Sequence, residues 1–344
     1  MMWREIGVAL TALVFMFWNV ENAFDTFDDP LKNDDEFTPG AVRHWTWSRF
    51  EAKRDGLAQT IVAAGDVWGE LPALVGLAEV ENRLVVSQLV RKTMLDELGY
   101  GYVHRESPDE RGIDVALLYR KDVFRVIAVD SLRIPETKTR DILYVTLREM
   151  PGLAGHDADN RRAGLVERQV LSGPGSAGPE KVLPRVGDDG LLHVFVVHLP
   201  SKRGGARSSD SRRAAALGVL QQAVDSLLTE DIDSHILVMG DFNDTEPVVV
   251  GLAPPARDTL PAEGFVPPGT LKYHGRWEQI DHFFLSPATG TAEMQIFAPS
   301  FLLEPDKAWL GVKPRRTYVG PRYHGGLSDH LPIVMQIKPK NMYL

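Results

Sequence analysis

The 344-residue chain contains no cysteine, which excludes disulfide bonds, thiolate-bound structural zinc and cysteine nucleophiles. It also lacks an excess of basic residues, because 38 lysines and arginines stand against 47 aspartates and glutamates and give a net charge of -9. This balance disfavours non-specific wrapping of nucleic acid by a basic surface. Local basic loops could still bind a phosphodiester backbone.

An apolar run of membrane-spanning length is also missing at the N-terminus. The run from Ile6 to Trp18 is interrupted by Gly7 and Thr11 and is too short for a membrane span. Behind Arg4 it superficially resembles a secretory signal. Cleavage after it would remove the strand that delivers Asn19, so we expect a core strand and not a cleavable signal. We therefore expect a soluble protein with no stable membrane span, in an unidentified compartment.

Two polar signatures lie far apart in the sequence. Residues 240–244 read GDFND and follow the apolar run 236–239, and residues 327–332 read LSDHLP close to the C-terminus. Each signature alone is typical of a turn or a surface loop. Together they place carboxylates, an amide and an imidazole at strand ends, where a metal-assisted attack on phosphorus could be assembled.

The same pattern recurs elsewhere along the chain. Strand-like apolar runs end at Asn19, Glu79 and His198, and Asp281 lies inside a further strand-like segment. Asp281 alone is equally typical of a buried structural carboxylate, and we expect Asp114 to be one. The pattern is an apolar run followed by a residue that is capable of chemistry.

In chain order this set resembles the endonuclease/exonuclease/phosphatase superfamily, the DNase I-like group. The residues that carry the resemblance are Asn19, Glu79, His198, Asp241, Asn243, Asp281, Asp329 and His330. The resemblance implies an α/β fold, a four-layer α/β sandwich of two packed mixed β-sheets flanked by helices, with the active site at one edge of the sheets. Because the motifs extend over nearly the whole chain, we expect a single domain over residues 1–344.

The resemblance also implies a divalent metal ion. Phosphate esters are anionic, and a hard cation on oxygen ligands would reduce the repulsion of a nucleophile. Glu79 is the first candidate ligand. Asp329 and Asn19 are expected in the same metal site, with Asn19 helping to fix the geometry. The ion is expected to be Mg²⁺, and Mn²⁺ accepts the same ligands.

The catalytic roles follow from the same resemblance. Asp241 would orient or deprotonate the attacking water, and Asn243 would hold a phosphate oxygen or that water. His330 would be held by Asp281, and His198 would donate to the phosphate or assist the leaving oxygen. We expect Glu21, two residues after Asn19, to have only a supporting role.

Basic residues gather where a phosphate would bind. Lys202 and Arg203 lie in a glycine-containing loop after His198, and Arg111 precedes a strand near the expected edge. A second cluster, residues 313–324, contains arginines with interleaved tyrosines and suits phosphate contact with base stacking. For any single one of these residues, a solvated surface position is the alternative.

Between the motifs, residues 49–64 and 83–98 have apolar residues at helical spacing and are expected to form outer helices. Residues 151–190 are rich in glycine and proline, and we expect a flexible insertion there that covers the site as a flap. Residues 275–281 lack the Pro-x-Trp-x-Asp-Arg stretch of inositol polyphosphate 5-phosphatases, which disfavours that substrate.

The sequence therefore predicts a metal-dependent hydrolase of phosphoester bonds, in first place a phosphodiesterase or nuclease that uses an activated water for in-line attack. The alternatives are a phospholipid phosphodiesterase of the sphingomyelinase type, a phosphomonoesterase and a catalytically silent binding protein. The partner would be a phosphoester substrate such as nucleic acid, and no obligate protein partner is indicated. Lipid hydrolysis would need exposed apolar loops, whereas we expect Trp309, Leu310 and Phe301 to be buried.

Overall fold

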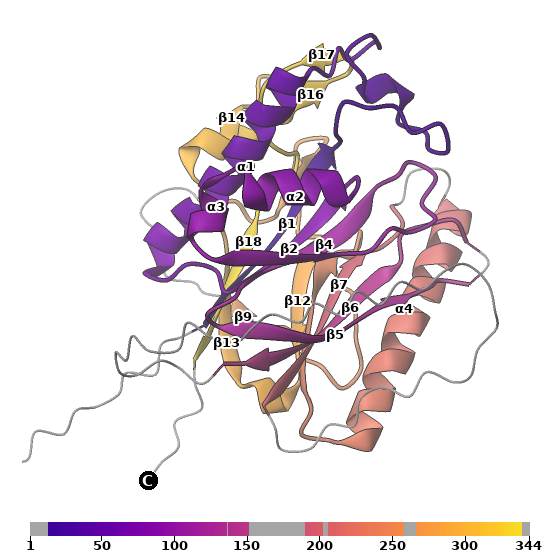
Figure 1. The fold of residues 1–344 in the computed structure, drawn as a ribbon, viewed down its shortest axis with the longest axis vertical. Coiled ribbons are helices and arrows are strands. Elements are labelled where there is room, and N and C mark those ends of the chain that lie inside the picture. Colours follow the sequence, from indigo (N-terminus) through magenta and orange to yellow (C-terminus); the bar gives the residue numbers. More distant parts are fainter. Residues whose placement is uncertain (1–12, 136, 151–189, 202–205, 258–265, 339–344) are drawn as a thin grey trace, which may run out of the picture.

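The computed structural model describes residues 13–135, 137–150, 190–201, 206–257 and 266–338. The described strands form two large sheets (Figure 1). The larger sheet has the order β3 (Tyr100–His104), β4 (Asp114–Arg120), β2 (Leu74–Val80), β1 (Leu13–Ala23), β18 (Ile333–Lys338), β13 (Thr291–Ile296) and β9 (Ala256–Arg257). The smaller sheet has the order β12 (Asp281–Leu285), β8 (His235–Asp241), β7 (Leu191–His198), β6 (Ile142–Glu149) and β5 (Phe124–Leu132).

Helices cover the outer faces of both sheets. The α-helices are α1 (Trp47–Trp68), α2 (Arg83–Arg91), α3 (Met94–Glu97) and α4 (Ala206–Glu230). Short 3₁₀ turns are found at Asp35–Phe37, Pro287–Thr289 and Ser300–Leu302. In Figure 1, α1 and α2 lie over the larger sheet, and α4 lies on the far side of the smaller sheet.

The core follows from the two-residue period of the strands. In β7, Val194 and Val196 belong to the central core that includes Phe17 of β1, whereas Phe195 and Val197 pack in a second cluster with residues of α4. The strands β6, β7 and β8 of the smaller sheet are thus buried on both faces, by the larger sheet on one side and by α4 on the other. The predicted four-layer α/β sandwich is confirmed.

The N-terminal apolar run supplies the central strand of the larger sheet. Residues 14–18 are buried in β1, which pairs antiparallel with β18 and parallel with β2. The predicted core strand is therefore present in the described part of the run. None of the described helices is both long enough and apolar enough to span a bilayer.

Two helix predictions and the predicted insertion have different outcomes. The helix expected over residues 49–64 lies inside α1. The single helix expected over residues 83–98 was wrong, because the chain breaks after α2 and restarts at α3, where Oγ1 of Thr93 accepts a hydrogen bond from the backbone N–H of Leu95. The insertion predicted at 151–190 lies outside the described residues except for Gly190.

Three two-stranded hairpins complete the described strands. They are β10 (Leu271–Tyr273) with β11 (Arg276–Glu278), β14 (Leu303–Pro305) with β15 (Val312–Pro314), and β16 (Tyr318–Val319) with β17 (Arg322–Tyr323). The expectation of buried Trp309, Leu310 and Phe301 was wrong, since these side chains are 58%, 79% and 49% exposed in or beside the β14–β15 hairpin. Their exposure places apolar residues at the surface, in or beside this hairpin.

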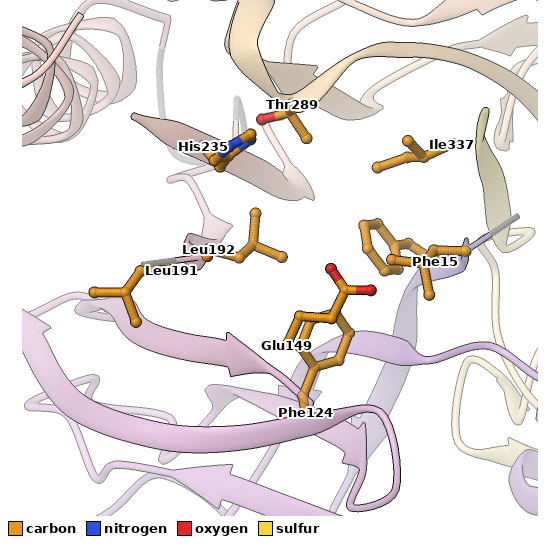
Figure 2. A pocket seen from close by; sticks show the side chains of 10 residues that line it. Phe15, Phe124, Glu149, Leu191, Leu192, His235, Thr289 and Ile337 are labelled. Carbon is orange, nitrogen blue, oxygen red and sulfur yellow. The ribbon is translucent and has the colours of Figure 1, made fainter. Parts of the chain in front are cut away.

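A cavity of about 270 Å³ lies at the strand ends opposite the predicted site residues (Figure 2). Its lining includes Phe15, Phe124 and Ile337, and among the described lining residues only Glu149 and His235 have an ionisable side chain. Two such groups, without the acidic cluster that the predicted chemistry requires, do not form the expected site.

Candidate active site

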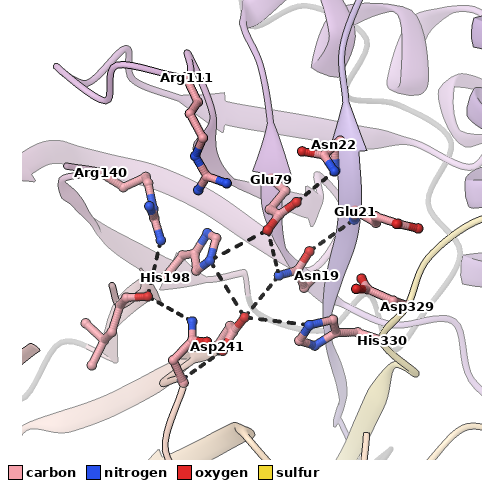
Figure 3. A network of polar contacts seen from close by, with 12 residues as sticks. Asn19, Glu21, Asn22, Glu79, Arg111, Arg140, His198, Asp241, Asp329 and His330 are labelled. Atoms are coloured by element: carbon pink, nitrogen blue, oxygen red, sulfur yellow. Dashed lines mark hydrogen bonds and ion pairs between the residues drawn. The ribbon is translucent and has the colours of Figure 1, made fainter. Parts of the chain in front are cut away.

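The predicted site residues that the structure describes converge at one edge of the sandwich, where β1, β2, β7 and β8 end (Figure 3). A pocket of about 420 Å³ opens there. Of the predicted residues, its lining includes Glu79, Arg111, His198, Asp241, Asn243, Asp329 and His330. Asn19 and Asp281 are buried beside the pocket and are bonded to its lining residues.

Strand register places three of these residues in one row. Parallel pairing of β7 with β8 sets His198 opposite Asp241, and antiparallel pairing of β8 with β12 sets Asp281 opposite Asp241. Gly240 permits the close approach, because a Cβ there would lie 2.2 Å from Cγ2 of Val197. The glycine of the 240–244 signature therefore has a packing role in delivering Asp241.

Backbone irregularities turn the side chains of the neighbouring strands into the site. The pairing of β1 with β2 shifts register between Asn19 and Ala23, and the pairing of β2 with β4 shifts at Glu79. Glu21, Asn22 and Glu79 adopt left-handed φ angles of 48°, 52° and 63°. Such bulges re-aim side chains, and the strain they contain is concentrated at functional sites.

Asn19 connects the metal-ligand candidate to the catalytic carboxylate. Its Nδ2 donates to Oδ2 of Asp241 at 3.0 Å and lies 3.4 Å from Oε1 of Glu79, and its Oδ1 accepts from the N–H of Glu21 at 3.0 Å. The N–H of Asn22 donates to Oε2 of Glu79 at 2.9 Å. The Glu79 carboxylate is thus held from two sides.

His330 lies between two carboxylates. Its Nδ1 is 2.8 Å from Oδ2 of Asp281, and its Nε2 is 3.9 Å from Oδ2 of Asp241. Burial alone would lower the pKa of His330, but Asp281 and then Asp241 hold it well above its usual value. Burial and the charge of Asp281 raise the pKa of Asp241 to about 7, against the opposing effect of His330. His330 is therefore an imidazolium at neutral pH, next to a carboxyl group that titrates there.

His198 lies on the other side of Asp241 and differs from His330 in charge. Its Nε2 is 3.7 Å from Oδ2 of Asp241 and 3.9 Å from Oε1 of Glu79. Burial lowers the pKa of His198 far below its usual value, and Arg140 and Arg111 add to the effect. His198 is therefore a neutral imidazole that can form hydrogen bonds but carries no charge.

The remaining predicted residues have mixed outcomes. Asn243 has a left-handed φ of 49°, and its Nδ2 donates to the backbone oxygen of Leu199 at 2.9 Å. The side chain of Arg111 is half exposed at the pocket. Lys202 and Arg203 lie outside the described residues.

Sequence reasoning missed two buried cations and undervalued a third side chain. Arg140 is buried, with Nη1 3.2 Å from Oδ2 of Asp109, and Nζ of Lys53 donates to Oγ1 of Thr317 at 2.7 Å. Glu21, expected only in a supporting role, lines the pocket. Its two-residue spacing from Asn19 was the available signal, whereas nothing local in the sequence marks Lys53 or Arg140.

The oxygen-rich part of the pocket fits a hard divalent cation. Glu79 has no lysine or arginine within ion-pair distance among the described residues, and its imidazole neighbour, His198, is neutral. Asp241, Asp281 and His330 also bring ligand atoms within 4.8 Å of one another, but Asp281 and His330 already bind each other. Glu79 is thus the carboxylate that most needs a cation, in a site with the donors that Mg²⁺ and Mn²⁺ accept.

Comparisons with known proteins agree with this geometry. The sequence matches the Endonuclease/Exonuclease/phosphatase family over residues 14–151, 182–253 and 260–339. No curated protein matches it.

Several solved structures resemble the chain. Truncated Caenorhabditis elegans TDP2 is 15% identical, with 95% of this chain and 97% of that chain covered and a TM-score of 0.52. D. rerio TDP2 complexed with single strand DNA product is 15% identical, with 95% and 99% covered and a TM-score of 0.51. An endonuclease/exonuclease/phosphatase family protein from Bacteroides thetaiotaomicron is 13% identical, with 95% and 98% covered and a TM-score of 0.50.

At these identities the solved structures show the shared fold, and the family match rests on the sequence itself. The match extends over most of the chain and includes Asn19, Glu79, His198, Asp241 and His330. The chain belongs to the Endonuclease/Exonuclease/phosphatase family and is an enzyme that hydrolyses phosphoester bonds.

Proposed function

We propose that this protein is a divalent-metal-dependent phosphodiesterase, in first place a nuclease, that cleaves a P–O bond by in-line attack of water. The observation that carries the proposal is the position of the Asp241 carboxylate at the pocket (Figure 3). Its Oδ2 lies 3.0 Å from Nδ2 of Asn19 and 3.9 Å from Nε2 of His330. The fold shared with a TDP2 that was crystallised with a single-strand DNA product supports nucleic acid as the substrate.

The proposed cofactor is Mg²⁺, and Mn²⁺ is expected to replace it. Glu79 would hold the ion, Asp329 would lie in the same site, and Asn19 would fix the Glu79 carboxylate through its hydrogen bond. When bound, the ion would neutralise charge on the phosphate.

Two side chains of the protein carry out the two proton transfers of the reaction. Asp241 accepts the proton of the attacking water as the new P–O bond forms. Of the two histidines, His330 is the one that is protonated at neutral pH, so it can supply the proton that the leaving oxygen needs as the old P–O bond breaks. Neutral His198 can only form hydrogen bonds, and we propose that it binds a phosphate oxygen. The half-exposed Arg111 would bind the phosphate as well.

Nicking of supercoiled plasmid tests this proposal. The wild-type protein is incubated with Mg²⁺ or Mn²⁺, with EDTA in a parallel sample, and compared with Asp241→Ala, His330→Ala and Glu79→Gln. Glu246→Ala is the matched control, because Glu246 is exposed two residues beyond the signature that carries Asp241. We expect nicking by the wild type and the control, and its loss in EDTA and in the three site variants. A folded wild type that leaves the plasmid intact would exclude the nuclease assignment.

The exposed apolar hairpin supports a second candidate, a phospholipid phosphodiesterase. Trp309 and Leu310 are 58% and 79% exposed, and a Cβ on Gly275 would lie 3.0 Å from Trp309. Gly275 connects β10 to β11, and Tyr273 at the end of β10 lines the pocket. An apolar tip beside a phosphoesterase pocket suits insertion into a lipid surface. Hydrolysis of sphingomyelin vesicles, lost in Trp309→Ala while a soluble phosphodiester is still cleaved, would favour this candidate over the nuclease.

A further inference from the structure

A guanidinium group lies between two carboxylates at the β1 side of the pocket. Nε and Nη2 of Arg316 are each 2.9 Å from Oε1 of Glu21, and Nη2 is 3.0 Å from Oδ2 of Asp329. All three residues line the pocket that contains Glu79 and Asp241. Arg316 thus joins two acids that are 308 positions apart in the sequence, taking the difference between 329 and 21.

The arrangement is rigidly built. The side chains of Glu21 and Asp329 are 5% and 16% exposed, and Oε2 of Glu21 accepts a hydrogen bond from the N–H of Thr317 at 3.0 Å. The buried ammonium of Lys53 donates to the backbone oxygen of Glu21 and to Oγ1 of Thr317. The N–H of Gly326 donates to the backbone oxygen of Arg316 at 3.0 Å. The guanidinium is therefore fixed through both of its neighbours and through its own backbone.

Charge explains why a cation is required at this place. Two carboxylates that converge in a buried position repel each other unless a cation lies between them. In two-metal phosphoesterase sites such a pair is satisfied by a second ion about 3.5–4 Å from the first. Here Arg316 already balances the charge of the two carboxylates, because its planar guanidinium group can bind both of them. Glu79, in contrast, has no lysine or arginine within ion-pair distance among the described residues, and its neighbour His198 is neutral.

We infer that Arg316 is the built-in second cation of this site, so that the protein binds one divalent ion, at Glu79, and not two. This inference rests on the proposed metal-dependent function. In it, Arg316 is a positioning residue that holds Asp329 toward the pocket and excludes a second ion from the space between Glu21 and Asp329.

Calorimetric titration of the metal-free full chain with Mn²⁺ tests the inference without any activity readout. We expect one bound ion for the wild type and two for Arg316→Ala, because the replacement frees Oε1 of Glu21 and Oδ2 of Asp329 as ligand atoms. Arg316→Lys keeps a cation and should stay at one. Arg315→Ala is the matched control, since the Arg315 side chain is exposed and lies near the backbone oxygen of His324. Removing Glu21 as well, in Arg316→Ala/Glu21→Gln, should return the count to one.

Two bound ions in the wild type, or one in a folded Arg316→Ala variant, would overturn the inference and leave the metal-dependent function standing. No bound ion in the wild type would overturn both. If Arg316→Ala does not fold, as judged by circular dichroism, the wild-type count and the Arg316→Lys count decide the question, because a two-ion site would show itself in the wild type.

Discussion

Nδ1 of His330 lies 2.8 Å from Oδ2 of Asp281, and both side chains are buried. The two residues come from the segment before β18 and the start of β12, so this contact ties the two sheets together at the pocket. A buried carboxylate bonded to an imidazole fixes both the orientation of the ring and its charge. The catalytic competence of His330 should therefore depend on Asp281.

Asp281→Asn is predicted to lower kcat by about 10²–10⁴-fold, the range that one general acid or base contributes. The replacement keeps the shape but removes the charge that holds the pKa of His330 above its usual value. The pKa of His330, followed by NMR with His330→Gln as the assignment control, should fall in the variant. A loss of kcat with an unchanged His330 titration would instead indicate a purely structural role for Asp281.

The rate should increase with pH through about 7 and then level off. Asp241 must be ionised to accept a proton, and its pKa is raised to about 7 by burial and by Asp281. Below this value the fraction of ionised Asp241 falls about tenfold per pH unit, and kcat/KM falls with it. A bound divalent ion favours the carboxylate, so saturating metal should move the midpoint to lower pH. A kcat/KM that stays flat between pH 5.5 and 8 at limiting metal concentration would contradict a catalytic base at Asp241.

Much of the fold could be predicted because its signals are local. The apolar runs of β1, β2, β7 and β8 end at polar residues, and Asn19, Glu79, His198 and Asp241 do meet at one edge. The family resemblance, and not a local signal, predicted that these strands belong to two packed sheets. No short segment of sequence determines strand order or register.

Two pairings in the site were missed for a common physical reason, although Arg316 itself belongs to the basic cluster 313–324 that the sequence indicated. Arg316 bonds to Glu21 across 295 positions and Lys53 bonds to Thr317 across 264 positions, so no spacing or period marks these pairs. The break between α2 and α3 was missed for a different reason, because the apolar spacing of residues 83–98 continues through it while Thr93 provides a new N-cap. The exposure of Trp309 could not be predicted from the sequence either, because an apolar residue in a short hairpin can be buried or exposed.

Asp114 should make the protein less stable as pH rises. Burial raises the pKa of Asp114 from 3.8 to about 8, so between these values the folded state binds the proton more tightly than the unfolded state. The stability this proton contributes is fully present below pH 3.8 and is lost as pH rises toward 8. The wild-type Tm should therefore fall more between pH 5 and pH 8 than that of Asp114→Asn, which cannot ionise. Asp122→Asn, at an exposed position, should follow the wild type.

Asn19→Ala is predicted to weaken Mn²⁺ binding about 10–100-fold, the usual effect of removing a residue that orients a metal ligand. Its Nδ2 lies 3.4 Å from Oε1 of Glu79, so its loss releases one side of that carboxylate. Ser328→Ala is a useful comparison for metal affinity, because Oγ of Ser328 donates to the backbone oxygen of Asn19 and accepts from the N–H of His330, with no hydrogen bond to Glu79 among the described residues. Equal Mn²⁺ affinities of Asn19→Ala and the wild type would remove Asn19 from the metal site.

The buried ion pair between Asp109 and Arg140 should dominate the stability of the loop behind the pocket. Both side chains are 6% exposed, and Nη2 of Arg140 donates to the backbone oxygen of Leu199, next to His198. Asp109→Asn keeps the oxygen that accepts from the N–H of Arg111 but leaves the guanidinium without its counter-ion. We expect a loss of about 3–5 kcal/mol in the free energy of unfolding.

The exposed pair of Arg120 and Asp122 provides the comparison for this last prediction, because a solvated ion pair contributes at most about 1 kcal/mol. Urea unfolding should therefore separate Asp109→Asn clearly from Asp122→Asn. If the cost arises from an uncompensated buried charge, Asp109→Asn/Arg140→Leu should recover part of the loss, since the double variant no longer buries a charge. Equal losses in the two single variants would mean that the Asp109–Arg140 pair is solvated in solution. The charge of a solvated Arg140 would then lower the pKa of His198 less than a buried charge does.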